Sequence, residues 1–279
     1  MLKLGPRPKI VGIVNVTPDS FSDGGRYLEP PKAIEHAREL RTAGADVIEL
    51  GAASSHPDSG KISPADELGR LAPVLSQLSS ADFDIGLDST QPEVQTFGIK
   101  NGVRFLNDIR GFPDSSIYDV LATSSCMLVV MHSVSRTEHA DRRNISAQSA
   151  FDSACRFFEE RLRRLTERGI ALDRIILDPG MGFFLSSNPE PSLAMLAHLP
   201  SIHQRFGLPL FVSVSRKSFL RNLMPSETCD LRIRTIAAEL FLRCMPVAYI
   251  RTHDVAVLNE GLATLEAIVR SRDCVRAPG

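Results

Sequence analysis

The stretch RIILDPGMGFFL, residues 174–185, carries the strongest structural signal in the chain. Residues 175–177 form an apolar, largely β-branched run, which is typical of a strand buried on both faces. Asp178 stands at the carboxyl end of this strand, and a Pro-Gly pair follows and ends it. The next helix is predicted to begin near Pro189, which is too far along the chain for Asp178 to cap it. The stretch therefore predicts a carboxylate placed for a small-molecule site.

Eight such apolar runs alternate with helical patterns along the 279 residues. The predicted strands are 10–14, 47–50, 85–87, 104–106, 128–131, 175–177, 210–214 and 247–250. The predicted helices are 31–42, 64–78, 92–100, 115–122, 146–168, 189–205, 231–244 and 255–270. No Gly-rich or polar linker divides the chain, so we predict a single (β/α)8 TIM barrel domain over residues 1–279. The alternative is a doubly wound open sheet, which usually carries a GxGxxG motif that is absent after the first strand here.

Polar residues stand just past nearly every predicted strand, where a TIM barrel builds its active site. They are Asn15, Ser54 and Ser55, Asp88, Asn107 and Asp108, His132, Asp178, residues 215–217 and residues 251–253. Helix capping favours Ser, Thr, Asp and Asn at such positions, but it does not favour Lys217, Arg251 or His253. The pattern therefore predicts an enzyme or a small-ligand binder.

Composition excludes other classes of function. The formal net charge is −1, so a basic nucleic-acid-binding face is not expected. The five cysteines form no CxxC pair, which indicates reduced thiols. Residues 1–9 lack the apolar core of a signal peptide, and no run of 18 apolar residues predicts a membrane span. We therefore expect a cytoplasmic protein.

Three side chains can converge from neighbouring strands: Asp88, Asn107 and Asp178. Two carboxylates and an amide match a flat heterocycle with an amino-pyrimidine edge, because carboxylates accept N–H bonds and an amide both donates and accepts. The alternative is that one of the acids pairs structurally with Arg216 or Lys217.

Cationic side chains predict a second half of the site. Lys217 and Arg251, with His253 on the same side of its strand as Arg251, fit a di- or triphosphate. Asn15 offers a hard oxygen ligand for Mg²⁺, which commonly takes one protein oxygen together with substrate phosphates and water. The loop after the first strand is long, polar and glycine-containing, so residues 17–27 are predicted to be a mobile flap.

Five motifs together resemble dihydropteroate synthase. They are NVTPDSFSDGG after the first strand, LNDIRGFPD after the fourth, LDPGMGF after the sixth, SVSRKS after the seventh and RTHDV after the eighth. The resemblance implies an enzyme that joins 6-hydroxymethyl-7,8-dihydropterin diphosphate to p-aminobenzoate and releases diphosphate in folate synthesis. Such an enzyme needs no protein nucleophile. Mg²⁺ and cationic side chains help the diphosphate to leave, and the neutral amine of p-aminobenzoate attacks the pterin methylene.

The resemblance also implies a role for each matching residue. The pterin would be held by Asp88, Asn107, Met131, Asp178 and Lys217. The diphosphate would be bound by Asn15, Ser55, His56, Arg251 and His253, with Asn15 as the magnesium ligand. The p-aminobenzoate pocket would comprise Phe21, Pro57, Phe183, Phe184 and Ser218. The catalytic set would be Asn15, Asp88, Asn107, Asp178, Lys217, Arg251 and His253. We expect a homodimer.

Two departures from the usual family pattern point to one branch. GAASSHPD at residues 51–58 replaces GGESTRPG, so Ser55 and His56 stand in place of threonine and arginine. Phe184 stands where the family usually has glycine. Together these features resemble the Sul-type dihydropteroate synthases, which are sulfonamide-insensitive. We therefore expect insensitivity with Phe184 as its main cause, unless Phe184 turns inward and only fills the core.

Two other functions stay open at this point. A methyltetrahydrofolate-dependent methyltransferase resembles this fold and holds a pterin with similar acids and amides. It needs no diphosphate cations, so Lys217 and Arg251 count against it. The second alternative is a non-catalytic pterin-binding barrel. The polar residues at so many strand ends count against this alternative.

Overall fold

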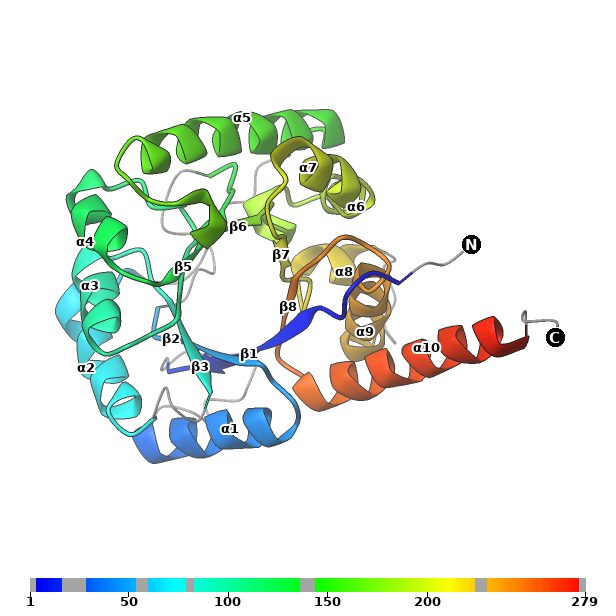
Figure 1. Ribbon diagram of the computed structural model, residues 1–279, viewed down its shortest axis with the longest axis horizontal. Helices are drawn as coiled ribbons and strands as arrows, with labels where there is room; N and C mark the ends of the chain where they lie inside the picture. Colours follow the sequence, from blue (N-terminus) through cyan, green and yellow to red (C-terminus); the bar gives the residue numbers. More distant parts are fainter. Residues whose placement is uncertain are drawn as a thin grey trace.

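Eight parallel strands form one sheet in the order β6-β5-β4-β3-β2-β1-β8-β7, which curls round on itself (Figure 1). An isolated parallel bridge between Leu177 and Leu210 joins its two edges. The strands are β1 (Lys9–Asn15), β2 (Val47–Gly51), β3 (Asp84–Asp88), β4 (Phe105–Asp108), β5 (Met127–Met131), β6 (Ile175–Asp178), β7 (Phe211–Val212) and β8 (Tyr249–Thr252). The structure is a computed structural model that describes residues 4–16, 29–53, 60–78, 83–135, 144–223 and 230–275. The predicted (β/α)8 barrel is confirmed.

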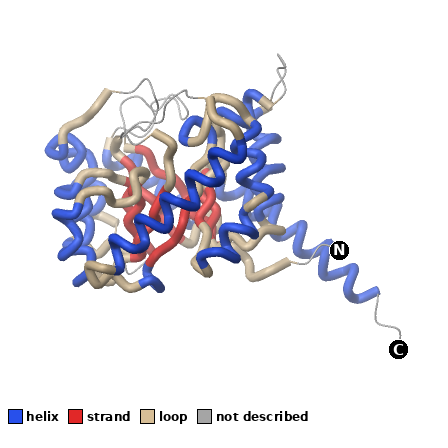
Figure 2. The backbone as a smooth tube through the Cα atoms, turned by 90° about the horizontal axis from the view of Figure 1, so that it is seen from above, coloured by secondary structure: helices blue, strands red, loops and turns tan. Residues whose placement is uncertain are grey.

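Helices cover the outside of the barrel, and the strands run through its middle (Figure 2). The helices are α1 (Pro30–Thr42), α2 (Pro64–Leu75), α3 (Pro92–Lys100), α4 (Tyr118–Thr123), α5 (Ala147–Thr166), α6 (Glu190–Ala197), α7 (Leu199–Phe206), α8 (Ser218–Asn222), α9 (Leu231–Leu242) and α10 (Val255–Val275), with 3₁₀ turns η1 (Ser115–Ile117), η2 (Leu172–Arg174) and η3 (Gly182–Phe184). The outer faces of the strands and the inner faces of these helices form the largest apolar core. In the described part of the chain, no helix is long and apolar enough to span a membrane.

Inside the barrel, side chains form two layers of opposite character. The layer toward the amino ends of the strands is apolar and comprises Val11, Val47, Phe105, Val129, Ile176 and Phe211, with Met127 and Tyr249 packed against it. Side chains alternate with a period of two along a strand, so the next inward position lies two residues further on. Those next positions include Glu49, Asn107, Asp178, Ser213 and Arg251. The polar site therefore rests on an apolar floor.

The predicted helix 189–205 is wrong as a single element. It is divided into α6 and α7 at His198, whose φ of −99° and ψ of 8° depart from helical values. Pro200 occupies one of the first two positions of α7. A proline lacks the backbone N–H that a continuing helix needs, and its ring collides with the preceding turn. This proline therefore starts a new helix.

Several strand boundaries also differ from the prediction, and those of β7 and β8 bear on the site. β7 contains only Phe211–Val212 of the predicted 210–214, and β8 ends at Thr252 and not at residue 250. Arg251 accordingly lies within β8, paired in register with Val11 of β1, and not in the loop beyond it. Its side chain is thereby directed into the barrel at a fixed height.

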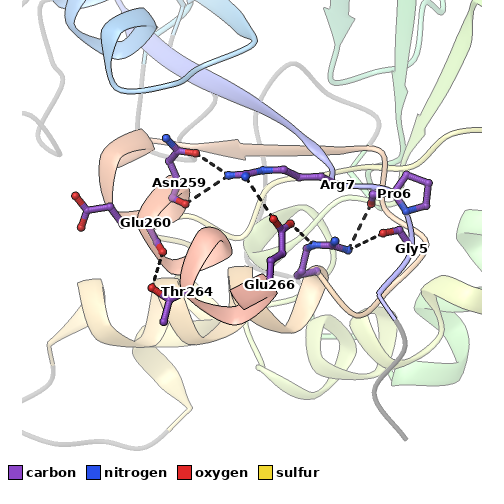
Figure 3. A network of polar contacts seen from close by, with 8 residues as sticks. Gly5, Pro6, Arg7, Asn259, Glu260, Thr264 and Glu266 are labelled. Atoms are coloured by element: carbon purple, nitrogen blue, oxygen red, sulfur yellow. Dashed lines mark hydrogen bonds and ion pairs between the residues drawn. The ribbon is translucent and has the colours of Figure 1, made fainter. Parts of the chain in front are cut away.

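An ion-pair network ties the beginning of the chain to the last helix (Figure 3). Arg7 donates from Nη2 to Oδ1 of Asn259 at 2.6 Å, and Arg243 donates from Nε to Oε1 of Glu266 at 2.9 Å. Arg243 also donates from Nη1 to the carbonyl oxygen of Gly5 at 3.1 Å. Asn259 and Glu266 lie on α10, and Arg243 follows α9. The network therefore fixes both helices to the segment that enters β1, at the end of the barrel opposite the polar site.

Candidate active site

The carboxyl ends of β1 to β4 bring four positions side by side. The register pairs Asn15 with Gly51, Gly51 with Asp88, and Asp88 with Asn107. A Cβ atom at Gly51 would lie 4.0 Å from both the Oδ1 of Asn15 and the Oδ2 of Asp88. Because Gly51 has no side chain, no group of β2 stands between these two oxygen atoms.

The guanidinium of Arg251 crosses the barrel and bonds two carboxylates. Its Nε donates to Oε1 of Glu49, and its Nη2 donates to Oδ2 of Asp88 at 3.0 Å. Burial, and then the negative charge of Glu49, raise the pKa of Asp88 to about 7, although Arg251 opposes the shift. Arg251 thus stabilises two neighbouring acids, the buried Glu49 and the partly exposed Asp88, that would otherwise repel each other.

Asp178 ends β6 and anchors the turn that follows it. Its Oδ1 accepts a hydrogen bond from the backbone N of Gly180 at 2.8 Å. Gly180 has a φ of +74°, and a Cβ there would lie 2.3 Å from the carbonyl oxygen of His132, so only glycine fits. Burial raises the pKa of Asp178 to about 6. The carboxylate is therefore held rigidly in a dry position.

Lys217 lies over an aromatic ring. Its Nζ is 4.7 Å from the centroid of Phe184, and the Phe184 ring packs in a small cluster with Ile109 and Met131. Burial, and then the charge of Arg251, lower the pKa of Lys217 to about 8. Phe184 is 5% exposed, so its ring does turn inward, where it packs against Met131 and lies next to the Lys217 ammonium of the candidate site.

His253 is a neutral donor and not a cation. The Oγ of Ser215 accepts from the backbone N of His253 at 3.2 Å and lies 2.9 Å from its Nδ1. A hydroxyl both donates and accepts, and we infer that Ser215 donates to Nδ1, which places the imidazole proton on Nε2. Burial, and then the cationic Arg216, Arg251 and Lys217, hold the pKa of His253 well below its ordinary value. The expected cationic cluster therefore consists of Lys217 and Arg251 alone.

These groups act on one another electrostatically, as residues of one site do. The pKa of Lys217 responds to Asp178, Asp88 and Glu49 as well as to Arg251. Three carboxylates thus act on an ammonium group that lies over the ring of Phe184, which packs against Met131. Such an arrangement can bind a flat, N–H-rich ring by its edge and its face.

Known proteins share this architecture and much of the sequence. A family model described as "Pterin binding enzyme" matches residues 11–253. "Dihydropteroate synthase type-2" from Escherichia coli is 50% identical over 259 residues, which cover 93% of this chain and 95% of that relative. The chain belongs to the dihydropteroate synthase family. These enzymes are transferases of folate biosynthesis.

Solved dihydropteroate synthases have the same fold. The Xanthomonas albilineans enzyme with 4-aminobenzoic acid superposes with a TM-score of 0.83 at 29% identity, covering 98% of this chain and 95% of that one. The Anaplasma phagocytophilum enzyme with bound 6-hydroxymethylpterin-monophosphate gives a TM-score of 0.81 at 31% identity, covering 94% of this chain and 99% of that one.

Several residues that the dihydropteroate synthase resemblance singled out lie outside the described ranges. They are Phe21, Ser55, His56 and Pro57, together with the flap at residues 17–27. The other three residues of the expected p-aminobenzoate pocket, Phe183, Phe184 and Ser218, are described. Ser218 begins α8, and a Cβ atom at Gly182 would lie 3.0 Å from its Oγ. Phe183 is half-buried against the cluster that contains Phe184.

Glu49 is the site residue that reasoning from the sequence missed. It is 2% exposed and bonds both Arg251 and Asn107. The site residues were predicted from the positions just past each strand, whereas Glu49 lies inside the run VIEL at 47–50. A charged residue inside an otherwise apolar barrel strand was the available signal, since burial of an unpaired carboxylate is very unfavourable.

The dihydropteroate synthase site offers only a sparse set of metal donors. Within the described ranges, no group of three or more His, Cys, Asp and Glu side chains could hold a metal ion by itself. Asn15 and Asp88 nevertheless place two oxygen atoms around Gly51. The Oδ2 of Asp88 already accepts from Arg251, which leaves Oδ1 of Asn15 as the protein oxygen for a metal. One such oxygen fits Mg²⁺, which commonly takes a single protein oxygen together with substrate phosphates and water.

Proposed function

We propose that the carboxyl end of this barrel binds 6-hydroxymethyl-7,8-dihydropterin diphosphate and joins its pterin to p-aminobenzoate, releasing diphosphate. One observation carries the proposal: Asp88 on β3 and Asp178 on β6 act electrostatically on Lys217, whose ammonium lies over the Phe184 ring that packs against Met131. The 50% identity to a dihydropteroate synthase favours this reaction over the methyltransferase and over a non-catalytic barrel.

We assign the pterin to Asp88, Asn107, Met131, Asp178 and Lys217. The carboxylate of Asp178 would accept N–H bonds from the amino-pyrimidine edge, and Met131 would pack against the ring face. Lys217 would donate to a ring acceptor and, with its charge, stabilise the bound heterocycle between two acids. Buried, pre-oriented groups of this kind bind without large reorganisation.

We assign the diphosphate to Asn15, Arg251 and His253, with Ser55 and His56 completing the site. Arg251 would contribute positive charge as the leaving group departs, and the neutral His253 would donate from Nε2. Asn15 would hold Mg²⁺ through its side-chain oxygen. When bound, this ion would neutralise charge on the departing diphosphate.

Assays of diphosphate release test the reaction directly. We expect release from the dihydropterin diphosphate to depend on p-aminobenzoate and Mg²⁺, with 7,8-dihydropteroate formed in equal amount. Diphosphate release without any condensation product, or no turnover at all with both substrates and Mg²⁺ present, would contradict the proposal.

We further propose that the enzyme is insensitive to sulfonamides because the Phe184 ring is a fixed obstacle. The ring is 5% exposed and is held by Ile109, Met131 and Lys217, so it cannot swing aside easily. The substrate and the drug share an aniline ring but differ beyond it, where the substrate has a small planar carboxylate and the drug a bulkier sulfonyl group. A rigid ring near that point discriminates between them.

We also propose a cytoplasmic homodimer. Two large apolar side chains on α9, Ile233 and Phe241, are 64% and 42% exposed, and Ile268 on the projecting helix α10 is 63% exposed (Figure 1). Exposed apolar residues on two adjacent helices are typical of a subunit interface. Sedimentation of the wild type and of Ile268→Asp tests this, with dissociation expected for the variant.

A further inference from the structure

Glu49 lies in the middle of β2, below the residues that face the proposed pterin. All five residues of β2 are buried, and Glu49 itself is 2% exposed. It follows Val47 of the apolar floor by two residues, so it occupies the first polar position above that floor. A carboxylate at such a depth is stable only when other groups bond it.

Both oxygen atoms of Glu49 accept hydrogen bonds from residues of the site. Oε1 accepts from Nε of Arg251, and Oε2 accepts from Nδ2 of Asn107 at 3.1 Å. Arg251 then bonds Asp88 through its Nη2 at 3.0 Å. Glu49 therefore connects β4 to β8 and fixes two side chains that the proposed reaction uses.

The bond to Asn107 decides which way its amide faces. An ionised carboxylate only accepts hydrogen bonds, so the NH₂ group of Asn107 must face Glu49 and its Oδ1 must face away. This Oδ1 is buried and has no hydrogen-bond partner in the described part of the chain. A buried acceptor without a partner is unfavourable, which indicates that a ligand N–H completes it.

The hydrogen bond between Glu49 and Arg251 similarly fixes the orientation of the Arg251 guanidinium. A guanidinium held at Nε by one carboxylate and at Nη2 by another cannot rotate about its long side chain. The remaining N–H groups therefore keep one direction, and the charge stays next to Asp88. Exposed arginines have no such constraint.

We propose that Glu49 is a positioning residue: it keeps the Asn107 oxygen turned toward the pterin and keeps the Arg251 guanidinium against Asp88. The inference rests on the proposed assignment of this site to a pterin. Glu49 does not itself touch the substrate, because its two oxygens are already engaged by Arg251 and Asn107.

The substitution Glu49→Gln tests the proposal with minimal change of shape. The glutamine amide accepts through one oxygen only, and its NH₂ group must face a donor of either Asn107 or Arg251. We expect the KM for the pterin diphosphate to rise about tenfold or more, with the KM for p-aminobenzoate within about twofold of wild type. A purely structural ion pair would lower stability or the active fraction but would leave both KM values unchanged.

A reversed pair supplies the rescue experiment. In the double variant Glu49→Gln/Asn107→Asp, the glutamine NH₂ donates to the new carboxylate, and the second carboxylate oxygen faces the pterin. The buried charge is also kept. We expect the raised pterin KM of each single variant to return most of the way to the wild-type value in the double variant. This should hold even where a single variant folds poorly.

Glu239→Gln is the matched control, because Glu239 is also a buried acid, 1% exposed, but lies on α9 outside the barrel interior. Its pterin KM should equal that of the wild type. A wild-type pterin KM in Glu49→Gln, or a double variant no better than either single variant, would overturn the inference. A wild type that neither binds pterin nor releases diphosphate would instead overturn the proposed function.

Discussion

The ammonium nitrogen of Lys217 lies 4.7 Å from the centroid of the Phe184 ring, so one aromatic residue supports a cation and forms part of the site wall. These two roles depend on different properties of the side chain. The cation–π contact requires a ring, whereas a steric obstacle requires only bulk. Substitutions at residue 184 can therefore separate them.

Phe184→Ala and Phe184→Leu form the matched pair. Phe184→Ala removes the bulk and should tighten sulfamethoxazole inhibition about a hundredfold, which corresponds to roughly 2.8 kcal/mol. Phe184→Leu retains bulk and should stay drug-insensitive, while its pterin KM rises about two- to fivefold through loss of the ring under Lys217. Inhibition constants and KM values measure both effects. A drug-sensitive wild type, or unchanged inhibition in Phe184→Ala, would show that Phe184 is not the obstacle.

The pH dependence of kcat/KM for the pterin substrate should have two limbs. Burial raises the pKa of Asp178 to about 6 and, together with the charge of Glu49, that of Asp88 to about 7, so the carboxylates that accept the pterin N–H groups are lost as pH falls through these values. Burial lowers the pKa of Lys217 to about 8, so its charge is lost as pH rises through 8. Lys217→Arg should move the alkaline limb out of range, because guanidinium does not titrate there. An alkaline limb that stays at about 8 in this variant would exclude Lys217 as its source.

The hydroxyl of Ser215 should matter only for the diphosphate half of the substrate. Ser215→Ala removes the partner of His253 Nδ1 and allows the imidazole to change tautomer and to tilt. Loss of one hydrogen bond predicts a rise of about two- to tenfold in the KM for the pterin diphosphate. Calorimetric binding of a pterin without diphosphate should not change, and Ser215→Thr, which keeps the hydroxyl, should retain most activity. Equal losses for both ligands would place His253 on the pterin instead.

The network around Arg243 should contribute to stability without affecting turnover. Arg243 and Glu266 have side chains only 6% and 15% exposed, and they lie at the amino ends of the strands. Arg243→Ala should lower the free energy of unfolding by about 1.5–3 kcal/mol. The exposed pair Arg163–Glu167 is the control, and Arg163→Ala should cost about 0.5 kcal/mol or less. Urea unfolding and kcat measure the two properties; an altered kcat in folded Arg243→Ala would contradict this separation.

The barrel could be predicted because its strands are buried on both sides and therefore appear as short continuous apolar runs. Element ends were less predictable. β8 begins at Tyr249, since the strand starts where its register with β1 begins and not at the first apolar residue, Val247. The break at His198 follows from Pro200, whose effect on helices is visible in the sequence but does not fix the point of the break.

Asp88, Asn107 and Asp178 could be predicted as candidate site residues because parallel strands end at one rim. The hydrogen bonds between the site side chains could not be predicted, since they depend on the height at which each side chain enters the barrel. Arg251 was expected to act on diphosphate alone, yet its position inside β8 brings it to Glu49 and Asp88. His253 was expected to join a cationic cluster, but burial next to three cations keeps it neutral.

Pterin binding by Asp178→Asn is the most direct test of the account. Asparagine keeps an oxygen for the backbone N of Gly180, which Asp178 bonds at 2.8 Å, so the turn should survive. It replaces the second carboxylate oxygen with a donor that faces the pterin N–H groups. Isothermal titration with 6-hydroxymethylpterin, alongside thermal unfolding, should show an affinity reduced roughly 10- to 150-fold in a folded variant. Wild-type affinity in Asp178→Asn would contradict the assignment of this rim as the pterin site.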